Sequence, residues 1–188
     1  VGIYFAGVKR LEGINLRVVN MSFAGYGKSY TVETALQYLR EQGVLVIAAA
    51  SNESSVWPVF PASYPLDNII SVAATDTADQ LTEWSNRGLY VDLAAPGNEV
   101  FSAYFDRESP VRYHQYAFLS GTSMAAPVVA GVASLIFSQY PNISYQHARD
   151  RILNSTDFLK NLWGMVGSGG RLNALKAIQP YLLLPNNP

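Results

Sequence analysis

Three short runs of apolar residues constrain the fold of this 188-residue chain more than any other feature. They cover residues 18–23, 44–50 and 69–74, and nearly every side chain in them is apolar. A strand with one face in water alternates apolar and polar residues, whereas a strand covered on both faces does not. The runs therefore predict strands of a buried parallel sheet, and residues 90–94 predict a fourth strand.

Amphipathic segments lie between these runs, as crossover helices do in an α/β fold. Ser29 or Thr31 is predicted to cap the first of them and Gly43 to end it, while Ser144 is predicted to cap a later one. The expected helices cover residues 31–42, the stretch from Ser123 to Pro141, residues 145–153 and residues 172–178. No repeat or linker interrupts this pattern, so one domain is expected.

The strongest functional signal is residues 121–127, which read Gly-Thr-Ser-Met-Ala-Ala-Pro before an apolar helical run. Pro127 suits the first turn of a helix because the N–H that it lacks has no partner there. Ser123 then stands at the helix N-terminus, where unpaired N–H groups and the positive end of the helix dipole stabilise an oxyanion. The pattern predicts a nucleophilic serine.

This motif resembles the nucleophile motif of the subtilases, or subtilisin-like serine proteases. The resemblance continues in family order through residues 19–23, 48–52, 68–76, 93–97 and 170–174. It implies the three-layer α/β fold of that family with its parallel sheet, here lacking the N-terminal strands. Residues 1–188 would be the C-terminal portion of one subtilisin-like peptidase domain, beginning inside a helix.

The resemblance also indicates which catalytic groups the chain lacks. In the family a histidine takes the proton of the serine and an aspartate orients that histidine, and both precede the region matched here. His114 and His147 fall at ordinary surface positions of the family. We therefore expect a serine endopeptidase that forms an acyl-enzyme on Ser123 and takes its aspartate and histidine from a separate N-terminal chain.

Two alternatives to this arrangement stay open. The chain could be a catalytically inactive pseudoprotease that serves binding or assembly, or a truncated form of an ordinary single-chain subtilase. The family's sheet also contains the strands that carry the aspartate and histidine. Without them, backbone donors and acceptors would be exposed beside apolar side chains. We therefore expect the chain to fold stably only with a second polypeptide.

Several residues match the substrate and oxyanion sites of the family. Asn52 corresponds to the asparagine whose amide, with the backbone N–H of the nucleophile, stabilises the oxyanion, and Thr122 would support it with a hydrogen bond. Ser22, Phe23 and Ala24 resemble the strand on which the family binds its polypeptide substrate as an added antiparallel strand.

The pocket for the side chain before the scissile bond departs from the family pattern. Ala24 and Ser51 stand where glycine is usual, and Val59 replaces a third glycine at the pocket floor. One methylene in such a pocket changes discrimination by roughly 1–3 kcal/mol. The sequence therefore predicts a shallow pocket that favours small or medium side chains.

A structural calcium ion is the one metal that the resemblance implies. Many subtilases bind calcium through backbone carbonyls of a loop like residues 61–65 and through an aspartate at the position of Asp92. Oxygen ligands of this kind suit calcium. The chemistry itself would require no cofactor.

Composition excludes other classes of function. The formal net charge of −1 gives no electrostatic reason to bind nucleic acid or an anionic membrane, and no cysteine is present for thiolate chemistry. No apolar stretch approaches the ~20 residues of a membrane span. A secreted or extracellular location, with a propeptide and a zymogen stage, is expected from the family resemblance.

Two other serine or glycine motifs are not favoured. Residues 22–29 end in Gly-Lys-Ser like a phosphate-binding loop, but Ser22 replaces the first glycine that wraps the phosphates. The elbow serine of an α/β-hydrolase needs glycine two residues after the nucleophile, and Ala125 stands there.

Overall fold

A computed structural model describes residues 2–105 and 115–179 of the chain. The helices in these ranges are α1 (Gly2–Leu11), α2 (Tyr30–Glu41), α3 (Thr122–Gln139), α4 (Tyr145–Asn154), the 3-10 turn η1 (Lys160–Leu162) and α5 (Ala174–Ile178). The strands are β1 (Val18–Met21), β2 (Leu45–Ala49), β3 (Ile69–Thr75), β4 (Leu93–Pro96), β5 (Val100–Tyr104), β6 (Gln115–Leu119), β7 (Asp157–Phe158) and β8 (Gly170–Arg171).

The main sheet has the strand order β1-β2-β3-β4-β8-β7, and only the short β7 runs antiparallel to its neighbour. The prediction of a mainly parallel sheet in an α/β fold is confirmed. The fourth strand begins three residues later than predicted, because a turn that brings the Val91 N–H to the Gly88 carbonyl occupies residues 88–91.

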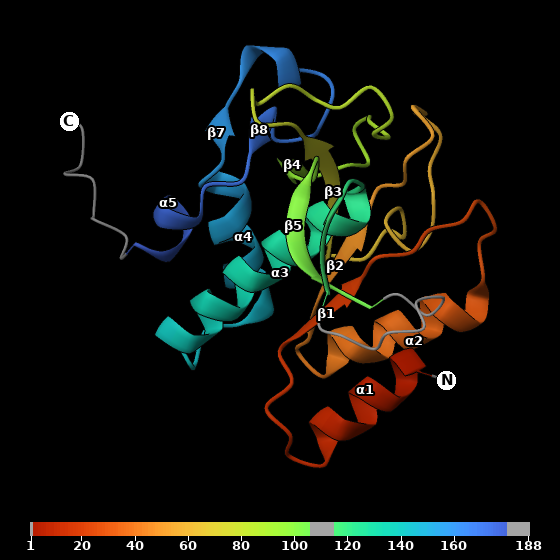
Figure 1. Cartoon of the computed structure of the whole chain (residues 1–188). Helices are drawn as coiled ribbons and strands as arrows, with labels where there is room; N and C mark the ends of the chain where they lie inside the picture. Colours follow the sequence, from red (N-terminus) through yellow and green to blue (C-terminus); the bar gives the residue numbers. More distant parts are fainter. Residues whose placement is uncertain (1, 106–114, 180–188) are drawn as a thin grey trace, which may run out of the picture.

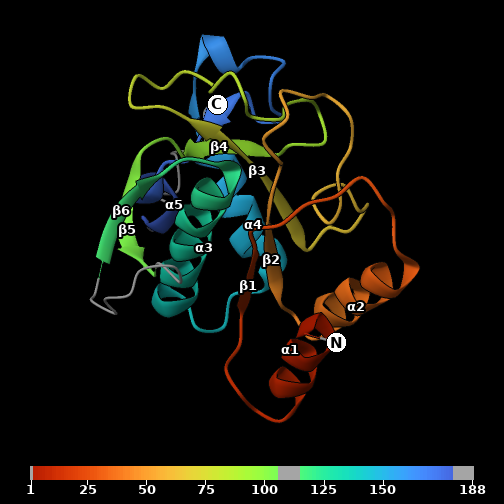
Figure 2. The same ribbon diagram turned by 45° about the vertical axis from the view of Figure 1, so that its right-hand side comes forward.

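Helices cover both faces of the sheet, which gives three layers (Figure 1). In β2, Leu45, Ile47 and Ala49 belong to the core beneath α3, whereas the intervening Val46 and Ala48 belong to the core beneath α2. Helices α1 and α2 lie side by side, away from α3 (Figure 2). Burial on both faces accounts for the absence of alternation in the apolar runs.

The predicted helix caps are present. The Ser29 hydroxyl accepts from the Val32 N–H at the start of α2, and the Ser144 hydroxyl accepts from the His147 N–H at the start of α4. Gly43, which follows the C-cap residue Gln42 of α2, has φ +72°, a conformation that glycine adopts without strain. Local side-chain chemistry therefore sets the ends of these helices.

Helix α3 is the central helix of the fold. It packs against β1, β2, β3 and β4, and its buried side chains include Val129, Ala133 and Ile136. By its 18-residue length and apolar composition alone, it is long enough to cross a membrane, although the sequence predicts no such stretch. Its contacts with four strands account for this apolar composition.

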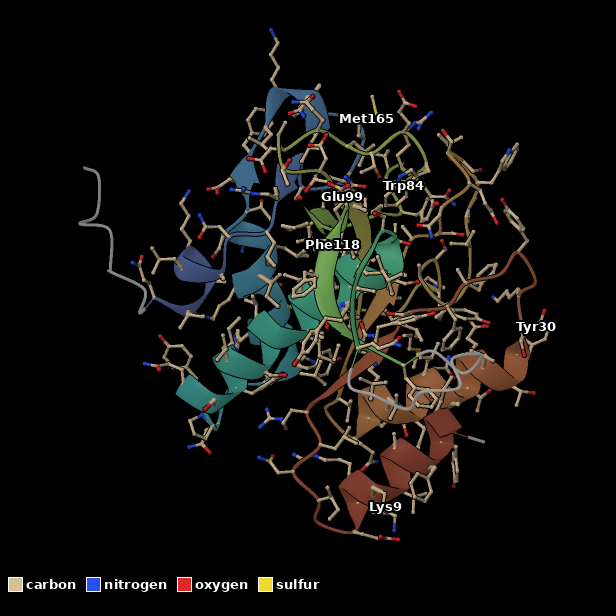
Figure 3. All side chains as sticks on the ribbon, in the orientation of Figure 1. Lys9, Tyr30, Trp84, Glu99, Phe118 and Met165 are labelled. Carbon is tan, nitrogen blue, oxygen red and sulfur yellow. The ribbon has the colours of Figure 1, made fainter. Side chains whose placement is uncertain are left out.

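The antiparallel hairpin of β5 and β6 was not predicted. Its register pairs Phe101 with Phe118, and the exposed ring of Phe101 stacks on Tyr116 and tilts against Phe118. Phe118 is labelled on this hairpin in Figure 3. The two strands form a separate sheet and are held together by exposed aromatic side chains that make no long apolar run. The periodicity of the sequence therefore does not reveal this hairpin.

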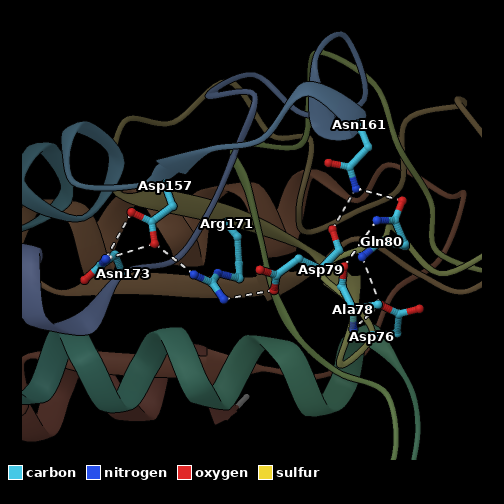
Figure 4. Close-up of polar contacts among 8 residues, drawn as sticks. All are labelled: Asp76, Ala78, Asp79, Gln80, Asp157, Asn161, Arg171 and Asn173. Carbon is cyan, nitrogen blue, oxygen red and sulfur yellow. Dashed lines mark hydrogen bonds and ion pairs between the residues drawn. The ribbon is translucent and has the colours of Figure 1, made fainter.

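Asp157 ties β7 to β8 and α5 in a polar cluster (Figure 4). Its carboxylate accepts from Lys176 Nζ at 2.7 Å, Arg171 Nη2 at 2.8 Å and Asn173 Nδ2 at 2.9 Å. The Lys176 contact is the largest of the causes that lower the pKa of Asp157 to about 2. The folded state therefore favours the ionised carboxylate more than the unfolded state does.

Replacing this carboxylate should remove a pH-dependent part of the stability. Because the folded pKa of Asp157 lies below the unfolded one, its contribution is present above pH 4 and is lost as the pH falls from about 4 to about 2. Asp157→Asn is expected to cost about 1–2 kcal/mol at pH 7. Urea unfolding at several pH values checks this, and a cost that stays constant down to pH 2 would contradict it.

Candidate active site

The predicted functional residues meet where the carboxyl ends of β1 and β2 face the N-terminus of α3. Ser22 follows β1, Asn52 follows β2 by three residues, and Ser123 lies in the first turn of α3. Because β1 and β2 are parallel neighbours, their carboxyl ends lie at the same edge of the sheet. Open α/β sheets bind ligands at this edge.

Ser123 is held against the end of β1 by two reciprocal hydrogen bonds. Its hydroxyl donates to the Ser22 carbonyl at 3.1 Å, and the Ser22 hydroxyl donates to the Ser123 carbonyl at 2.8 Å. Over residues 2–105 and 115–179, nothing accepts a hydrogen bond from the Ser123 backbone N–H. A serine hydroxyl and a backbone donor without an acceptor in the described ranges thus lie together at a helix N-terminus.

Asn52 is oriented by Thr122, which is fully buried. Its amide oxygen accepts from the Thr122 N–H at 2.9 Å and from the Thr122 hydroxyl at 3.0 Å. The same hydroxyl accepts from the Ser51 N–H at 3.1 Å. Because its oxygen is engaged, Asn52 keeps its NH₂ group as the outward donor.

Gly121 leaves room between the two donors. The point where a Cβ on Gly121 would lie is 3.2 Å from Asn52 Nδ2 and 3.6 Å from the backbone N of Ser123. Both donors therefore border the same small space, as stabilisation of an oxyanion requires. A side chain at position 121 would occupy part of that space.

The segment after β1 has main-chain groups available for an added strand. Phe23 and Ala24 are exposed and form no backbone hydrogen bond with any other part of the chain that the structure describes. Gly25 then pairs antiparallel with Phe60, through hydrogen bonds of 2.9 and 2.8 Å. An extended peptide could bind to residues 22–24 through its own main chain.

The pocket positions differ from one another in their surroundings. Ser51 has φ +81°, a left-handed conformation that strains residues other than glycine. Ala24 is exposed, whereas Val59 is buried in the core beneath α2. The Tyr26 hydroxyl donates to the Glu53 carboxylate and so joins the segment after β1 to the loop after β2.

Asp92 lines the same cavity as residues 62–65, and its carboxylate already pairs with Arg149. Its oxygens accept from the Ser71 N–H at 2.8 Å and from Arg149 Nη2 at 2.9 Å. Burial is the largest influence and raises the pKa of this carboxyl above its usual value. A calcium ion here would lie beside a guanidinium, so these residues do not favour calcium, and the calcium prediction stays untested.

Neither histidine is found near Ser123 in the described ranges. His147 lies in the first turn of α4 with Nδ1 3.2 Å from the Ser144 hydroxyl, and His114 lies outside the described residues. Lys28 of the loop 22–29 pairs with Glu33 at 3.0 Å, and Gly25 is committed to Phe60. This loop therefore shows no arrangement suited to phosphate.

The fold and the site together define a hydrolase-like arrangement of a helix-terminal serine and two amide donors. The chain matches the subtilase family over residues 2–174, and it belongs to that family. It is 39% identical over 163 residues to thermitase of Thermoactinomyces vulgaris, which covers 87% of this chain and 54% of thermitase. It is 35% identical over 156 residues to subtilisin DY of Bacillus licheniformis, covering 80% and 54%.

Solved structures show the same fold. A protease from Pseudoalteromonas arctica PAMC 21717 superposes with a TM-score of 0.77 at 29% identity, covering 86% of this chain and 50% of that one. The prenylagaramide maturation protease PagA also gives 0.77, at 26% identity, covering 94% and 66%. This chain spans about half the length of the curated relatives described above.

Proposed function

We propose that this chain is the nucleophile-bearing part of a serine endopeptidase, and that a separate N-terminal chain supplies the aspartate and histidine of the triad. The observation that carries the proposal is Ser123 at the start of α3, beside the amide donors of Asn52 and its own backbone. The substrate would be a polypeptide bound along residues 22–24.

In the proposed reaction, Ser123 Oγ attacks the carbonyl carbon of the scissile peptide bond. The partner's histidine takes the hydroxyl proton and then gives it to the leaving amine, which breaks the C–N bond. Asn52 Nδ2 and the Ser123 N–H donate to the oxyanion. Water then hydrolyses the acyl-enzyme with the same histidine as the base.

The free edge of β1 supports a partner that extends the sheet. Among the described strands, β1 pairs only with β2. The Leu45 N–H donates to the Arg17 carbonyl, and alternation in a parallel ladder directs the main-chain groups of Val18 and Asn20 away from β2. An unpaired edge of this kind is a template for another strand.

A cavity beside Ser123 gives the partner's histidine a place to enter. It has a volume of about 350 Å³ and lies between the start of α3 and the hairpin of β5 and β6. Met124, Pro127 and Val100 contribute its apolar lining. An apolar wall would exclude water from the proton transfer.

Labelling with a fluorophosphonate tests this function, because such probes react with a serine that a nearby base activates. The chain is treated alone and after assembly with its N-terminal part, and the peptide holding Ser123 is mapped by mass. Labelling only after assembly supports the proposal, with Ser123→Ala as the control. Absence of labelling in an assembled sample free of propeptide would favour the pseudoprotease.

We also propose an extracellular protease made as a zymogen with a propeptide. The relatives that support this location include the halolysin-like extracellular serine protease Nep of Natrialba magadii, which is 41% identical over 135 residues. Fractionation of the source cells tests it, and a purely intracellular protease would contradict it.

The pocket of the proposed enzyme is expected to respond to Ser51→Gly. Removal of the hydroxymethyl group widens the pocket, so cleavage after phenylalanine should gain relative to cleavage after alanine. Relief of the positive φ should also stabilise the protein by about 0.5–1 kcal/mol. A peptide series and urea unfolding measure the two effects.

Ser54→Gly is the matched control for this variant. Ser54 has φ +53° in the same loop, so glycine there should also stabilise the protein, but without changing the preference between alanine and phenylalanine. Equal shifts in preference for the two variants would show that the loop, rather than the Ser51 side chain, sets the pocket.

A further inference from the structure

Asn86 is a fully buried residue that bonds to the chain on both sides of Asn52. Its backbone N–H donates to the Ser51 carbonyl at 2.9 Å. Its side-chain oxygen accepts from the Glu53 N–H at 2.9 Å and from the Ser55 N–H at 3.1 Å. The backbone and the side chain of Asn86 thus both bond to the loop 51–55, which carries the amide donor Asn52.

Asn86 is itself anchored to the sheet. The Ser85 hydroxyl donates to the Asn86 carbonyl at 3.1 Å and accepts from the Ala74 N–H in β3 at 3.0 Å. On the other side of Asn86, the Arg87 N–H donates to the Ser55 carbonyl at 3.0 Å. A continuous set of hydrogen bonds thus runs from β3 to the loop 51–55.

The loop needs such support because its backbone is strained. Ser51 and Ser54 both have positive φ, at +81° and +53°, and each lies next to a residue that Asn86 or its neighbours bond. The Ser54 N–H donates to the carbonyl of Trp84, which Figure 3 labels, at 2.9 Å. Residues in this conformation persist only where surrounding contacts hold them.

The exposed Asn52 depends on this loop for its position. Thr122 fixes the amide oxygen of Asn52, but the backbone of Asn52 lies in the strained loop 51–55. An oxyanion donor lowers the barrier only if it is already in place when charge develops. A loop that relaxed would move the amide away from the space beside Gly121.

We propose that Asn86 is a positioning residue for the oxyanion donor Asn52. It acts through the hydrogen bonds to Glu53 and Ser55 and does not touch the substrate. The inference rests on the proposed serine endopeptidase function, and one of its tests does not depend on activity.

Hydrogen exchange of residues 51–55 is the test that does not depend on activity. In the assembled protease, Asn86→Ala should increase exchange at Glu53 and Ser55, because their N–H groups lose the side-chain oxygen that accepts from them. Asn68→Ala is the matched control. Asn68 is also fully buried, and its amide donates to the Leu36 and Val44 carbonyls.

Kinetics separates positioning from a general loss of structure. Asn86→Ala should lower kcat by about 10- to 100-fold with little change in KM, a smaller loss than the about 100- to 1000-fold for removal of a donor. Asn68→Ala should leave kcat near wild type. In a double variant, Asn86→Ala should add less than about twofold to the loss caused by Asn52→Ala.

The outcomes distinguish the inference from the function on which it rests. Exchange at residues 51–55 that is unchanged in Asn86→Ala would overturn the inference, and so would a kcat loss that adds fully to that of Asn52→Ala. Absence of turnover by the assembled wild type would overturn the proposed function, while the exchange comparison would still decide the role of Asn86.

Discussion

Ser123→Ala in the assembled protease is expected to lower kcat by about a million-fold and to leave KM nearly unchanged. The hydroxyl is the atom group that forms the acyl-enzyme, so no covalent step remains without it. Residual hydrolysis would come from the amide donors and from substrate binding along residues 22–24. Steady-state kinetics with a peptide ester and a peptide amide, together with fluorophosphonate labelling, measures the loss.

Ser22→Ala is the comparison for this variant. It removes the hydroxyl that donates to the Ser123 carbonyl at 2.8 Å but keeps the Ser22 carbonyl that accepts from Ser123 Oγ. We expect at most an about tenfold fall in kcat, since one neutral hydrogen bond is worth about 1 kcal/mol. Activity in Ser123→Ala above one-hundredth of wild type would show that another group is the nucleophile.

The sheet could be predicted because its signal is local. The apolar runs behind β1, β2 and β3 reflect burial on both faces, and the capping residues Ser29 and Ser144 act on the next turn of chain. The predicted start of β4 is three residues too early, because Val91 is as apolar as a strand residue although it lies in a turn. The hairpin and the short β7 and β8 depend on pairing between distant residues, which periodicity does not report.

The site was predictable only where the family motifs cover it. Asn52 is identified from the resemblance, whereas Ser123 is also indicated by the helix-start pattern of residues 121–127. The structure brings both residues to one edge of the sheet. Asn86 and Arg149 act through contacts with segments 31 to 80 residues away, so no local pattern reveals them. The strained φ of Ser51 had one indirect signal, since the family usually has glycine there.

Asn20→Pro is expected to weaken assembly with the N-terminal chain by about 10- to 100-fold. Proline removes the main-chain N–H of residue 20, so the carbonyl of the partner strand that would accept from it is buried without a donor. Asn20 directs its N–H away from β2, so proline there spares the β1–β2 ladder while blocking a strand added on the other side. Titration of one chain with the other, followed by activity and by light scattering, measures the effect.

Two variants of the same strand show whether the edge itself is responsible. Asn20→Ala removes only the side-chain bond from Nδ2 to the Ser22 hydroxyl, at 2.9 Å, and should assemble normally. Val19→Pro removes an N–H that the ladder with β2 uses, so it should destabilise the chain itself. If Asn20→Pro assembled as tightly as wild type, the partner would not extend the sheet at β1. If the wild-type chain alone were a monomer with a cooperative melt, it would need no partner to fold.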